Sequence, residues 1–389
     1  MKNQTLTHWI DRVRQFSWAL LLLTLPVTSF PFFPGGVGGE TLIRPLAIYP
    51  LILLVVLVTI PRLFTRPLPR TLLPLLGFVV LATLSSILAL TTGTSSLRGI
   101  PMSDRIFRNL ITLGIGCAFF LTVVLYPKSL QELTRSLRWL YIGFAIALLW
   151  GSMQAIYVIH FDPGYFDWMN QLHSLISTRK LFETRISGMT FEPKWFAEQL
   201  SFLLLPWLVG SVISRQSVSK WRFRWITIEL LLLIWAVGVL LFTFSRTGFV
   251  LLILTTFLGI LLSRIMMRGE PRTGKRSILN RRVILPAVIA TLAMTAVILV
   301  VGTQNRYFSR IWSYWTSDSP RRLSFLEYIV VEQRLVYWET AYRMYEDSPF
   351  LGVGLGNYAF YFEEFLPNDP ANRQTEILRQ LTPVEGRVR

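Results

Sequence analysis

The chain has 389 residues, of which 52% are hydrophobic and only 16% are charged. This composition excludes an ordinary soluble globular protein and indicates a protein embedded in a lipid bilayer. The formal net charge of +17 comes from basic residues in short clusters between long apolar runs, a distribution that argues against a nucleic-acid-binding domain. The single cysteine, Cys117, lies in an apolar run and excludes an internal disulfide.

Nine apolar segments are long enough to cross a membrane. A bilayer core about 30 Å thick requires roughly 20 mainly apolar residues in a helix, because the backbone polar groups must be satisfied within the segment. The segments are 16–33, 45–64, 71–90, 110–126, 137–160, 195–213, 223–244, 247–267 and 283–301. Pro26, Pro74 and Pro206 lie inside three of them and are expected to kink these helices without ending them. We predict an all-α fold, a polytopic membrane helix bundle of about nine transmembrane helices with a partly helical extracytoplasmic segment.

Lysine and arginine residues concentrate in alternate loops. These loops are the N-terminus, 62–70, 128–138, 215–224 and 264–282. Together they hold 20 basic and 3 acidic side chains, an excess equal to the net charge of the whole chain. Because basic loops stay in the cytoplasm, they are predicted to be cytoplasmic, together with the N-terminus. The odd number of spans then divides the chain into a transmembrane helix bundle, residues 1–302, and an extracytoplasmic segment, residues 303–389.

The loop before the sixth predicted span is more polar than a connector requires. It covers residues 161–194 and ends in TRISGMTFEPK, which contains Arg185, Glu192 and Lys194. Two interpretations are open. The basic residues either meet lipid headgroups at the interface or belong to a polar cluster directed into a cavity.

Arg246 lies at the tip of the hairpin between the seventh and eighth predicted spans. As an isolated basic residue it would extend to the outer interface. The positive-inside bias disfavours a basic residue on this side, which instead favours an anionic partner. Both interpretations stay open from the residues alone.

Residues 332–357 predict an amphipathic helix followed by a glycine-rich loop. The apolar positions of the helix recur at spacings of three and four: Leu335, Trp338, Tyr342 and Tyr345. Arg334 precedes Trp338 by one turn, and Asp347-Ser-Pro349 ends the helix. The loop residues that let the backbone approach another surface are Gly352, Gly354, Gly356 and the closing Asn357. A plain tight turn is the alternative.

The sequence contains no metal-binding or nucleophile motif. Its three histidines are His8, His160 and His173. They form no Cys/His cluster in the sequence, and neither H-E-x-x-H nor G-x-S-x-G occurs, so we predict no metal and no cofactor. Glu229, inside the seventh predicted span, is expected to pair with Arg222 or Arg224, with a proton-relay carboxylate as the alternative.

These motifs, in this order, resemble those of bacterial O-antigen ligases and the related polysaccharide polymerases. The shared region of that family carries a Ser-Arg-x-Gly hairpin and, later, an Arg-(x)3-Trp helix leading to Pro-(x)2-Gly-x-Gly-x-x-Asn. The matching residues here are Ser245-Arg246-Thr247-Gly248, Arg334 with Trp338, and Pro349-Phe-Leu-Gly352-Val-Gly354-Leu-Gly-Asn357. Arg185-Ile-Ser-Gly188 with Glu192-Pro193 is similar to the family segment before a central span, so the resemblance covers roughly residues 185–361.

The resemblance implies a membrane glycosyltransferase of the bacterial inner (plasma) membrane. It would transfer a glycan from undecaprenyl diphosphate to a hydroxyl of a glycan or lipid acceptor at the periplasmic face. Negative charge then develops on the leaving diphosphate, and guanidinium groups stabilise it because their geometry matches phosphate oxygens. The predicted catalytic residues are therefore Arg185, Arg246 and Arg334. The predicted substrate-binding residues are Glu192, Lys194, Trp338, Gly352, Gly354 and Asn357.

The chain departs from the family pattern at its C-terminal end. Family members usually continue to a histidine-containing segment and further membrane helices, whereas this sequence has no histidine after His173. We expect a C-terminally truncated chain that is inactive by itself, or the use of another base such as Glu192 or Asp347. A membrane transporter or inorganic-carbon-uptake accessory protein is the alternative function, and a structural or assembly subunit is a third.

Overall fold

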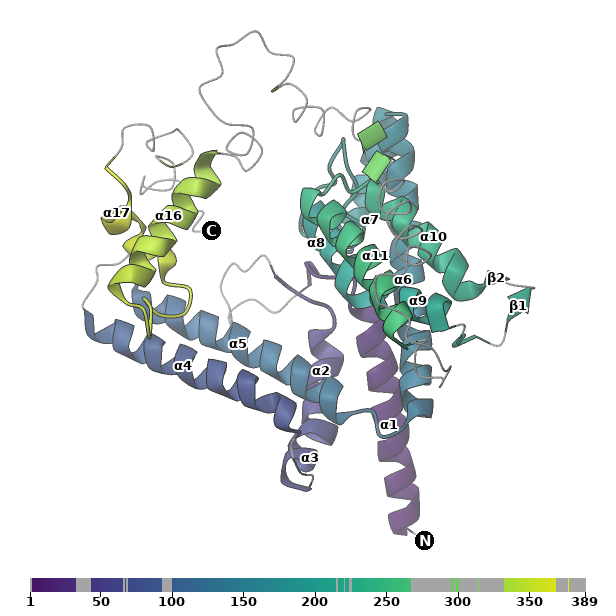
Figure 1. The fold of residues 1–389 in the computed structure, drawn as a ribbon. Helices are drawn as coiled ribbons and strands as arrows, with labels where there is room; N and C mark the ends of the chain where they lie inside the picture. The colour runs from purple at the N-terminus through teal and green to yellow at the C-terminus, as the bar shows by residue number, and fades with distance from the viewer. Residues whose placement is uncertain are drawn as a thin grey trace, which may run out of the picture. The chain divides into compact units, whose positions relative to one another are not determined.

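The structure of the protein is a computed structural model, and Figure 1 labels its helices and strands in chain order. The described residues are 2–32, 43–65, 67, 69–92, 100–214, 216–219, 221–223, 226–266 and 332–368, with the isolated positions 295, 296, 299, 300, 314 and 377. Packing divides the chain into two compact units. Unit 1 consists of Met1–Val58 and Leu125–Trp312, and unit 2 consists of Thr59–Val124 and Ser313–Arg389. The predicted division into residues 1–302 and 303–389 stays a prediction.

Unit 1 is a helical bundle in which α6 is the longest element. Its elements in chain order are α1 (Lys2–Thr24), α2 (Ile48–Leu54), α6 (Leu130–Ile159), α7 (Pro163–His173), α8 (Pro193–Gln199), the π-helical turn η4 (Leu200–Leu204), α9 (Leu205–Ser214), the antiparallel strands β1 (Arg222–Phe223) and β2 (Ile226–Thr227), α10 (Ile228–Leu241) and α11 (Arg246–Met266). α6 contacts α1, α7 and α10, whereas α8 and α9 pack on α11. α6 begins after Ser129 because the Ser129 hydroxyl accepts a hydrogen bond from the Glu132 N–H at 3.2 Å.

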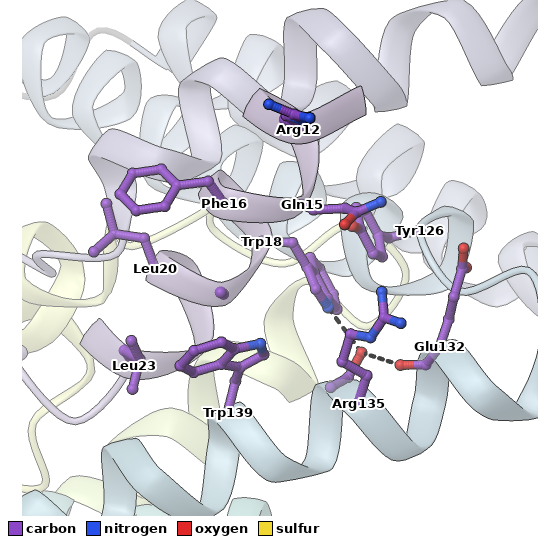
Figure 2. Close-up of a pocket in the computed structure, with 12 residues that line it drawn as sticks. Arg12, Gln15, Phe16, Trp18, Leu20, Leu23, Tyr126, Glu132, Arg135 and Trp139 are labelled. Carbon is purple, nitrogen blue, oxygen red and sulfur yellow. Dashed lines mark hydrogen bonds between the residues drawn. The ribbon is translucent and has the colours of Figure 1, made fainter. Parts of the chain in front are cut away.

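α1 and α6 approach each other closely at Gly143. A Cβ atom on Gly143 would lie 2.9 Å from the Cα atom of Leu23 in α1. Small residues permit such close helix contacts in membranes. On the same interface, the Trp18 indole N–H donates to Ser136 Oγ at 2.8 Å. Beside this contact the interface opens into a pocket with a cavity volume of about 370 Å³ (Figure 2).

Unit 2 joins two apolar helices from the first half of the chain to the C-terminal segment. Its elements are α3 (Ile60–Thr65), the 3₁₀ turn η2 (Arg70–Leu72), α4 (Leu73–Ala89), the 3₁₀ turn η3 (Leu90–Thr92), α5 (Met102–Leu125), α16 (Glu332–Asp347) and α17 (Tyr358–Phe365). The π-helical turn η1 (Val55–Thr59) links α2 to α3 along the chain. Ala89, Met102 and Ile106 form a buried cluster on which Phe360 and Tyr361 pack. This cluster fixes α17 against the C-terminal end of α4 and the first turns of α5.

Four described helices are long and apolar enough to cross a membrane. They are Ile48–Thr65, Met102–Leu125, Leu130–Ile159 and Pro193–Ser214. Shorter apolar helices cover Leu73–Ala89, Ile228–Leu241 and Arg246–Gly259. These helices correspond to the second through the eighth predicted spans, so the mainly helical membrane fold is confirmed. The count of nine spans is not confirmed, and the predicted span 283–301 lies outside the described residues except for four isolated positions.

The first predicted span and two of the three prolines differ from expectation. α1 ends two residues before Pro26, and its charged N-terminal half keeps it out of the four candidate spans. The expectation that Pro26 only kinks a helix is wrong, because the residue before a proline avoids the helical conformation. Pro74 does not kink a helix either, since it lies in the first turn of α4. Pro206 does lie inside a continuous helix, as the second residue of α9 after η4, and π-helical turns accommodate such local disruptions.

Glu229 is buried at the start of α10 and anchors the preceding loop. Its carboxylate accepts hydrogen bonds from the Ser217 hydroxyl at 2.8 Å and from the Val218 N–H at 2.7 Å. Hydrogen bonds of this kind satisfy a buried carboxylate. The predicted pairing with Arg222 or Arg224 involves side chains outside the described part of the chain.

Candidate functional site

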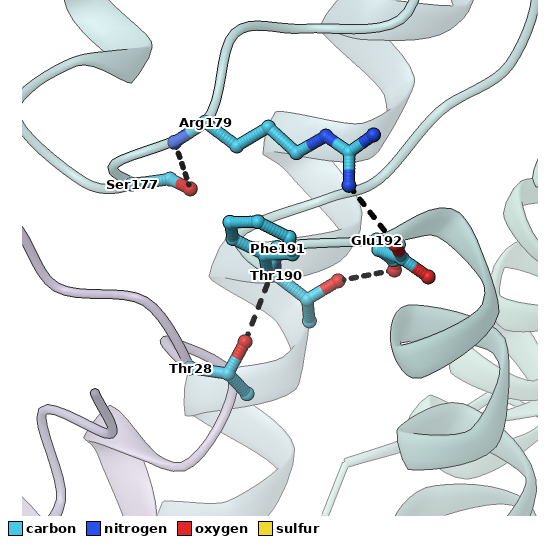
Figure 3. Close-up of polar contacts among 6 residues, drawn as sticks. All are labelled: Thr28, Ser177, Arg179, Thr190, Phe191 and Glu192. Atoms are coloured by element: carbon cyan, nitrogen blue, oxygen red, sulfur yellow. Dashed lines mark hydrogen bonds and ion pairs between the residues drawn. The ribbon is translucent and has the colours of Figure 1, made fainter. Parts of the chain in front are cut away.

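One end of unit 1 is formed by the α7–α8 loop, residues 174–192. The Oγ atoms of Ser177 and Ser29 lie 2.6 Å apart in a buried hydrogen bond. Farther along the loop, the Phe191 N–H donates to Thr28 Oγ1 at 3.2 Å (Figure 3). Because both contacts use the segment that follows α1, the two ends of the loop are tied to the same element.

Gln154 holds the middle of the α7–α8 loop. This residue belongs to α6, and its side chain is completely buried. Oε1 accepts hydrogen bonds from the N–H groups of Ser187 and Gly188, and Nε2 donates to the Gly188 carbonyl, each at 2.9 Å. Gly188 has a φ of +57°, and a Cβ atom there would lie 2.7 Å from the Phe196 ring. Glycine is therefore required at this position for both conformation and space.

Arg179 and Arg185 share one aromatic ring. The Cζ atoms of Arg179 and Arg185 lie 4.4 Å and 4.6 Å from the centroid of the Phe182 ring. Arg179 also lies 4.8 Å from the Phe191 ring and forms a 2.9 Å ion pair with Glu192 (Figure 3). In a cation–π contact the flat face of the guanidinium group lies against the ring, so its N–H donors point outward along the edge of the group. The loop therefore holds two oriented guanidinium groups beside one ring.

Arg246 is the first residue of α11 and is partly buried. Ser245 before it caps the helix, because Ser245 Oγ accepts a hydrogen bond from the Gly248 N–H at 3.2 Å. A Cβ atom on Gly248 would lie 2.6 Å from the Ala197 Cβ of α8, so only glycine fits. Phe244 has a φ of 46°, a left-handed conformation that reverses the chain between α10 and α11. The Ser-Arg-x-Gly motif is thus a helix cap, a close packing position and an arginine at a helix N-terminus.

A backbone hydrogen bond links the two arginine-bearing segments of unit 1. The Ile186 N–H, next to Arg185, donates to the Phe242 carbonyl at 3.1 Å, four residues before Arg246. The N-terminus of α11 adds a partial positive charge at this point. We call Arg179, Arg185 and Arg246 the arginine cluster. Guanidinium groups on neighbouring segments at a helix N-terminus are suited to binding phosphate oxygens.

Glu192 and Lys194, both predicted to bind substrate, form ion pairs in unit 1. Glu192 pairs with Arg179 and so borders the arginine cluster. Lys194 lies in the first turn of α8, with its amine 3.5 Å from the carboxylate of Glu198 one turn later. Partly exposed pairs of this kind contribute about 0–1 kcal/mol to stability. Glu192 therefore helps to position Arg179, whereas Lys194 pairs along the surface of α8.

The glycine-rich loop of unit 2 is docked on α4 and α5. The Leu355 N–H donates to Ser86 Oγ at 3.2 Å, near the end of α4. From the first turns of α5, Arg105 donates to the Gly356 carbonyl at 2.8 Å and Asn109 donates to the Leu355 carbonyl at 3.0 Å. These contacts place the loop at the C-terminal end of α4 and the N-terminal end of α5.

The conformation of this loop depends on its glycines. All three glycines of the loop have left-handed φ angles: Gly352, Gly354 and Gly356. A Cβ atom on Gly354 would lie 2.5 Å from Asn357 Nδ2 and 3.0 Å from the Ala89 Cβ. Asn357 is completely buried, and its Nδ2 donates to the Val353 carbonyl at 3.1 Å. The structure thus gives Gly354 and Asn357 a part in forming the loop, and their contact with a substrate stays a prediction.

The packed face of α16 is not the predicted apolar face. The buried positions recur every four residues: Val336, Thr340 and Met344. The predicted positions are all exposed: Leu335, Trp338, Tyr342 and Tyr345. Val336 packs with Phe362 of α17, and this short partner leaves the bulkier aromatic stripe uncovered. Arg334 is also exposed, one turn before Trp338.

His173 is buried at the end of α7. Its Nδ1 accepts a hydrogen bond from the Trp150 indole N–H at 3.3 Å, and the two rings stack within 9° of parallel. Desolvation by burial lowers the pKa of His173 to about 4. His173 is therefore neutral near pH 7 and packs α7 onto α6.

The described helices that are long and apolar enough to cross a bilayer indicate a multi-pass membrane protein. Residues 231–378 match the family model described as O-antigen ligase, and this match supports a relation to the O-antigen ligase-related family. The matched region contains Arg246, Arg334, Trp338 and the glycine-rich loop. The match supports a membrane glycosyltransferase-like role in polysaccharide biosynthesis. No curated protein and no solved structure matches the chain.

Sequence reasoning missed Gln154 and Arg179 in unit 1 and Arg105 and Asn109 in unit 2. Gln154 is an amide in the middle of an apolar window, and such side chains bond other segments within membranes. Arg179 lies on the predicted outer side, against the positive-inside bias that singled out Arg246. The same bias applies to Arg105. Arg179 and Arg105 thus carried the same signal as Arg246.

Proposed function

We propose that this protein transfers a glycan from undecaprenyl diphosphate to a hydroxyl of a glycan or lipid acceptor at the periplasmic face of the inner membrane. The observation that carries the proposal is the arginine cluster. Two guanidinium groups share the Phe182 ring on a loop that is hydrogen-bonded to the turn before Arg246. The family match over residues 231–378 supports the same class of reaction.

The transfer places its largest electrostatic demand on the leaving group. The bond between the sugar anomeric carbon and the phosphate oxygen breaks, and the acceptor oxygen forms a new bond to that carbon. The lipid diphosphate leaves with the bonding electron pair, and the acceptor hydroxyl gives up its proton. Donors already oriented toward the leaving oxygens stabilise this charge at little reorganisation cost. Hydrogen bonds to charged groups contribute about 1.5–3 kcal/mol each.

The arginines of unit 1 receive different roles in this proposal. Arg185 and Arg246 would bind the diphosphate oxygens. Arg179, fixed between two aromatic rings and paired with Glu192, would position Phe182 and add positive charge. Apolar helices would hold the polyprenyl chain in the bilayer while the diphosphate stays at the interface.

The remaining predicted residues lie in unit 2. Arg334 and Trp338 lie one turn apart on the exposed side of α16, where an arginine and an aromatic ring would meet a ligand from the same direction. We propose that Arg334 binds phosphate and that Trp338 contacts the glycan or acceptor. The glycine-rich loop, which includes Gly352, would then set the position of α16 relative to α17.

Binding of the lipid diphosphate tests the proposal without depending on turnover. The chain in nanodiscs is titrated with undecaprenyl diphosphate, and glycan transfer from the glycan-linked carrier is measured in parallel. Arg185→Gln and Arg246→Gln are each expected to weaken binding by at least about tenfold, since each removes a charge-assisted contact. Arg343→Gln is the matched control, because this exposed arginine pairs with Glu339 within α16. Binding that is unchanged in both cluster variants would overturn the assignment of the site.

A further inference from the structure

A second polar site lies at the opposite end of unit 1 from the arginine cluster, in the pocket between α1 and the start of α6 (Figure 2). Two arginines line it, Arg12 from α1 and Arg135 from α6. Neither forms an ion pair with another residue that the structure describes. The lining carboxylate, Glu132, accepts a hydrogen bond from the Lys128 N–H at 2.7 Å. The pocket therefore presents two guanidinium groups that form no ion pair among the described residues.

An apolar wall continues from these arginines along α1. Phe16, Leu20 and Leu23 follow Arg12 on one face of the helix, and Trp139 of α6 lies across from Leu23 (Figure 2). α1 rises about 16 Å between Arg12 and Leu23. Phe16 is 69% exposed and Leu20 is 37% exposed. The wall is thus long enough for much of an acyl chain, and the protein leaves it partly uncovered.

The length of α6 sets the depth of this pocket in a bilayer. Arg135 and Ile159 are separated by about 36 Å along the helix axis. The hydrocarbon core is about 30 Å thick, so a helix whose Ile159 end carries a loop at one interface places Arg135 at the other. The two arginines then lie at headgroup level, and the apolar wall runs into the hydrocarbon.

We infer that this pocket binds an anionic glycerophospholipid. Its phosphate-bearing headgroup contacts Arg12 and Arg135, and one acyl chain lies along Phe16, Leu20 and Leu23. Basic pockets between transmembrane helices are suited to anionic lipid headgroups. A free anion would leave the apolar wall unused, and a zwitterionic lipid would bring a positive charge to the arginines. This site is independent of the proposed transfer reaction.

Tryptophan quenching by brominated lipid tests the inference. The full chain is reconstituted in phosphatidylcholine vesicles that contain a small fraction of brominated phosphatidylglycerol or, separately, of brominated phosphatidylcholine. Quenching by the anionic lipid is expected to exceed quenching by the zwitterionic lipid, and Trp139→Phe is expected to remove most of the excess. Arg12→Gln with Arg135→Gln is expected to weaken the apparent preference about 30-fold. Arg70→Gln with Arg108→Gln removes the same charge outside the pocket and is expected to keep the preference.

Three results would overturn the inference. The first is equal quenching by both lipids, and the second is a preference that survives in the double pocket variant. The third is loss of the preference when millimolar inorganic phosphate is added at constant ionic strength, because this would identify a free-anion site. Thermal unfolding in pure phosphatidylcholine establishes whether the double variant is folded. If it is not, the salt dependence of the unaltered chain decides, because a preference that does not fall with rising salt contradicts contacts at the headgroup level.

Discussion

Replacing Gln154 with leucine removes the hydrogen bonds that shape the α7–α8 loop while keeping a side chain of similar size. The native amide accepts from the N–H groups of Ser187 and Gly188 and donates to the Gly188 carbonyl. Leucine leaves these three backbone groups without partners in a buried site. Each unpaired group costs about 1–3 kcal/mol, so the closed loop is expected to lose roughly 3–9 kcal/mol relative to an opened state.

Amide hydrogen exchange measures this loss directly. Because about 1.4 kcal/mol corresponds to a tenfold change, exchange in peptides covering residues 185–190 is expected to accelerate at least about a hundredfold. Exchange elsewhere in α6 is expected to change little. Carrier binding is expected to weaken as well, since Arg185 directly precedes the segment that Gln154 fixes.

Ser152→Ala is the matched control, two residues away on the same helix. Ser152 accepts a hydrogen bond from the Trp235 indole at 2.8 Å and forms no side-chain hydrogen bond with the described α7–α8 loop. This variant is expected to lose stability without faster exchange in the loop. Unchanged loop exchange in Gln154→Leu, or equal acceleration in both variants, would refute the reasoning that Gln154 holds the loop.

Three further outcomes follow from close packing and burial. Gly143→Ala is expected to lower the thermal unfolding midpoint in detergent, at a cost of about 1–3 kcal/mol, because its Cβ would meet the α1 backbone, whereas Gly77→Ala, with nothing within 4 Å, is expected to be neutral or slightly stabilising. Gly354→Ala is expected to expose the glycine-rich loop to limited proteolysis more than Gly352→Ala, because both positions require a left-handed φ but only Gly354 also lacks space. Since His173 has an unfolded pKa of 6.5 and a folded pKa of about 4, its contribution to stability is complete above pH 6.5 and is lost as the pH falls toward 4, about 3 kcal/mol in all. A pH series of unfolding midpoints measures this loss, and a profile that His173→Phe leaves unchanged would contradict the assignment.

Membrane helices and their motifs were predictable because they depend on local composition. The second through the eighth predicted spans correspond to helices of the structure. The sequence also predicts α16, its end before Pro349, and the Ser-Arg-x-Gly hairpin. The effect of each proline was harder to predict. A proline follows the end of α1, another lies in the first turn of α4, and a third lies within α9. Whether a helix continues through a proline depends on contacts with neighbouring helices, which the local sequence does not reveal.

The apolar face of α16 shows where periodicity misleads. The spacing of Trp338, Tyr342 and Tyr345 predicts the apolar face of an amphipathic helix, yet a different stripe centred on Thr340 is buried. The exposed aromatic stripe and the buried stripe both fit a helical period. The buried stripe is the one that packs against α17, where Val336 meets Phe362. Hydrophobic size alone does not identify the partner surface.

The sequence by itself determined a helical membrane protein with arginines in its predicted outer loops. Only the tertiary structure decided how those arginines are held. Gln154 bonds a residue 34 positions later, and the glycine-rich loop bonds Ser86 from 269 positions away. Hydrophobicity and helix propensity act over a few turns, so they leave a trace in the sequence. The partner of a loop depends on which helix ends meet in space, and that is fixed only when the bundle packs.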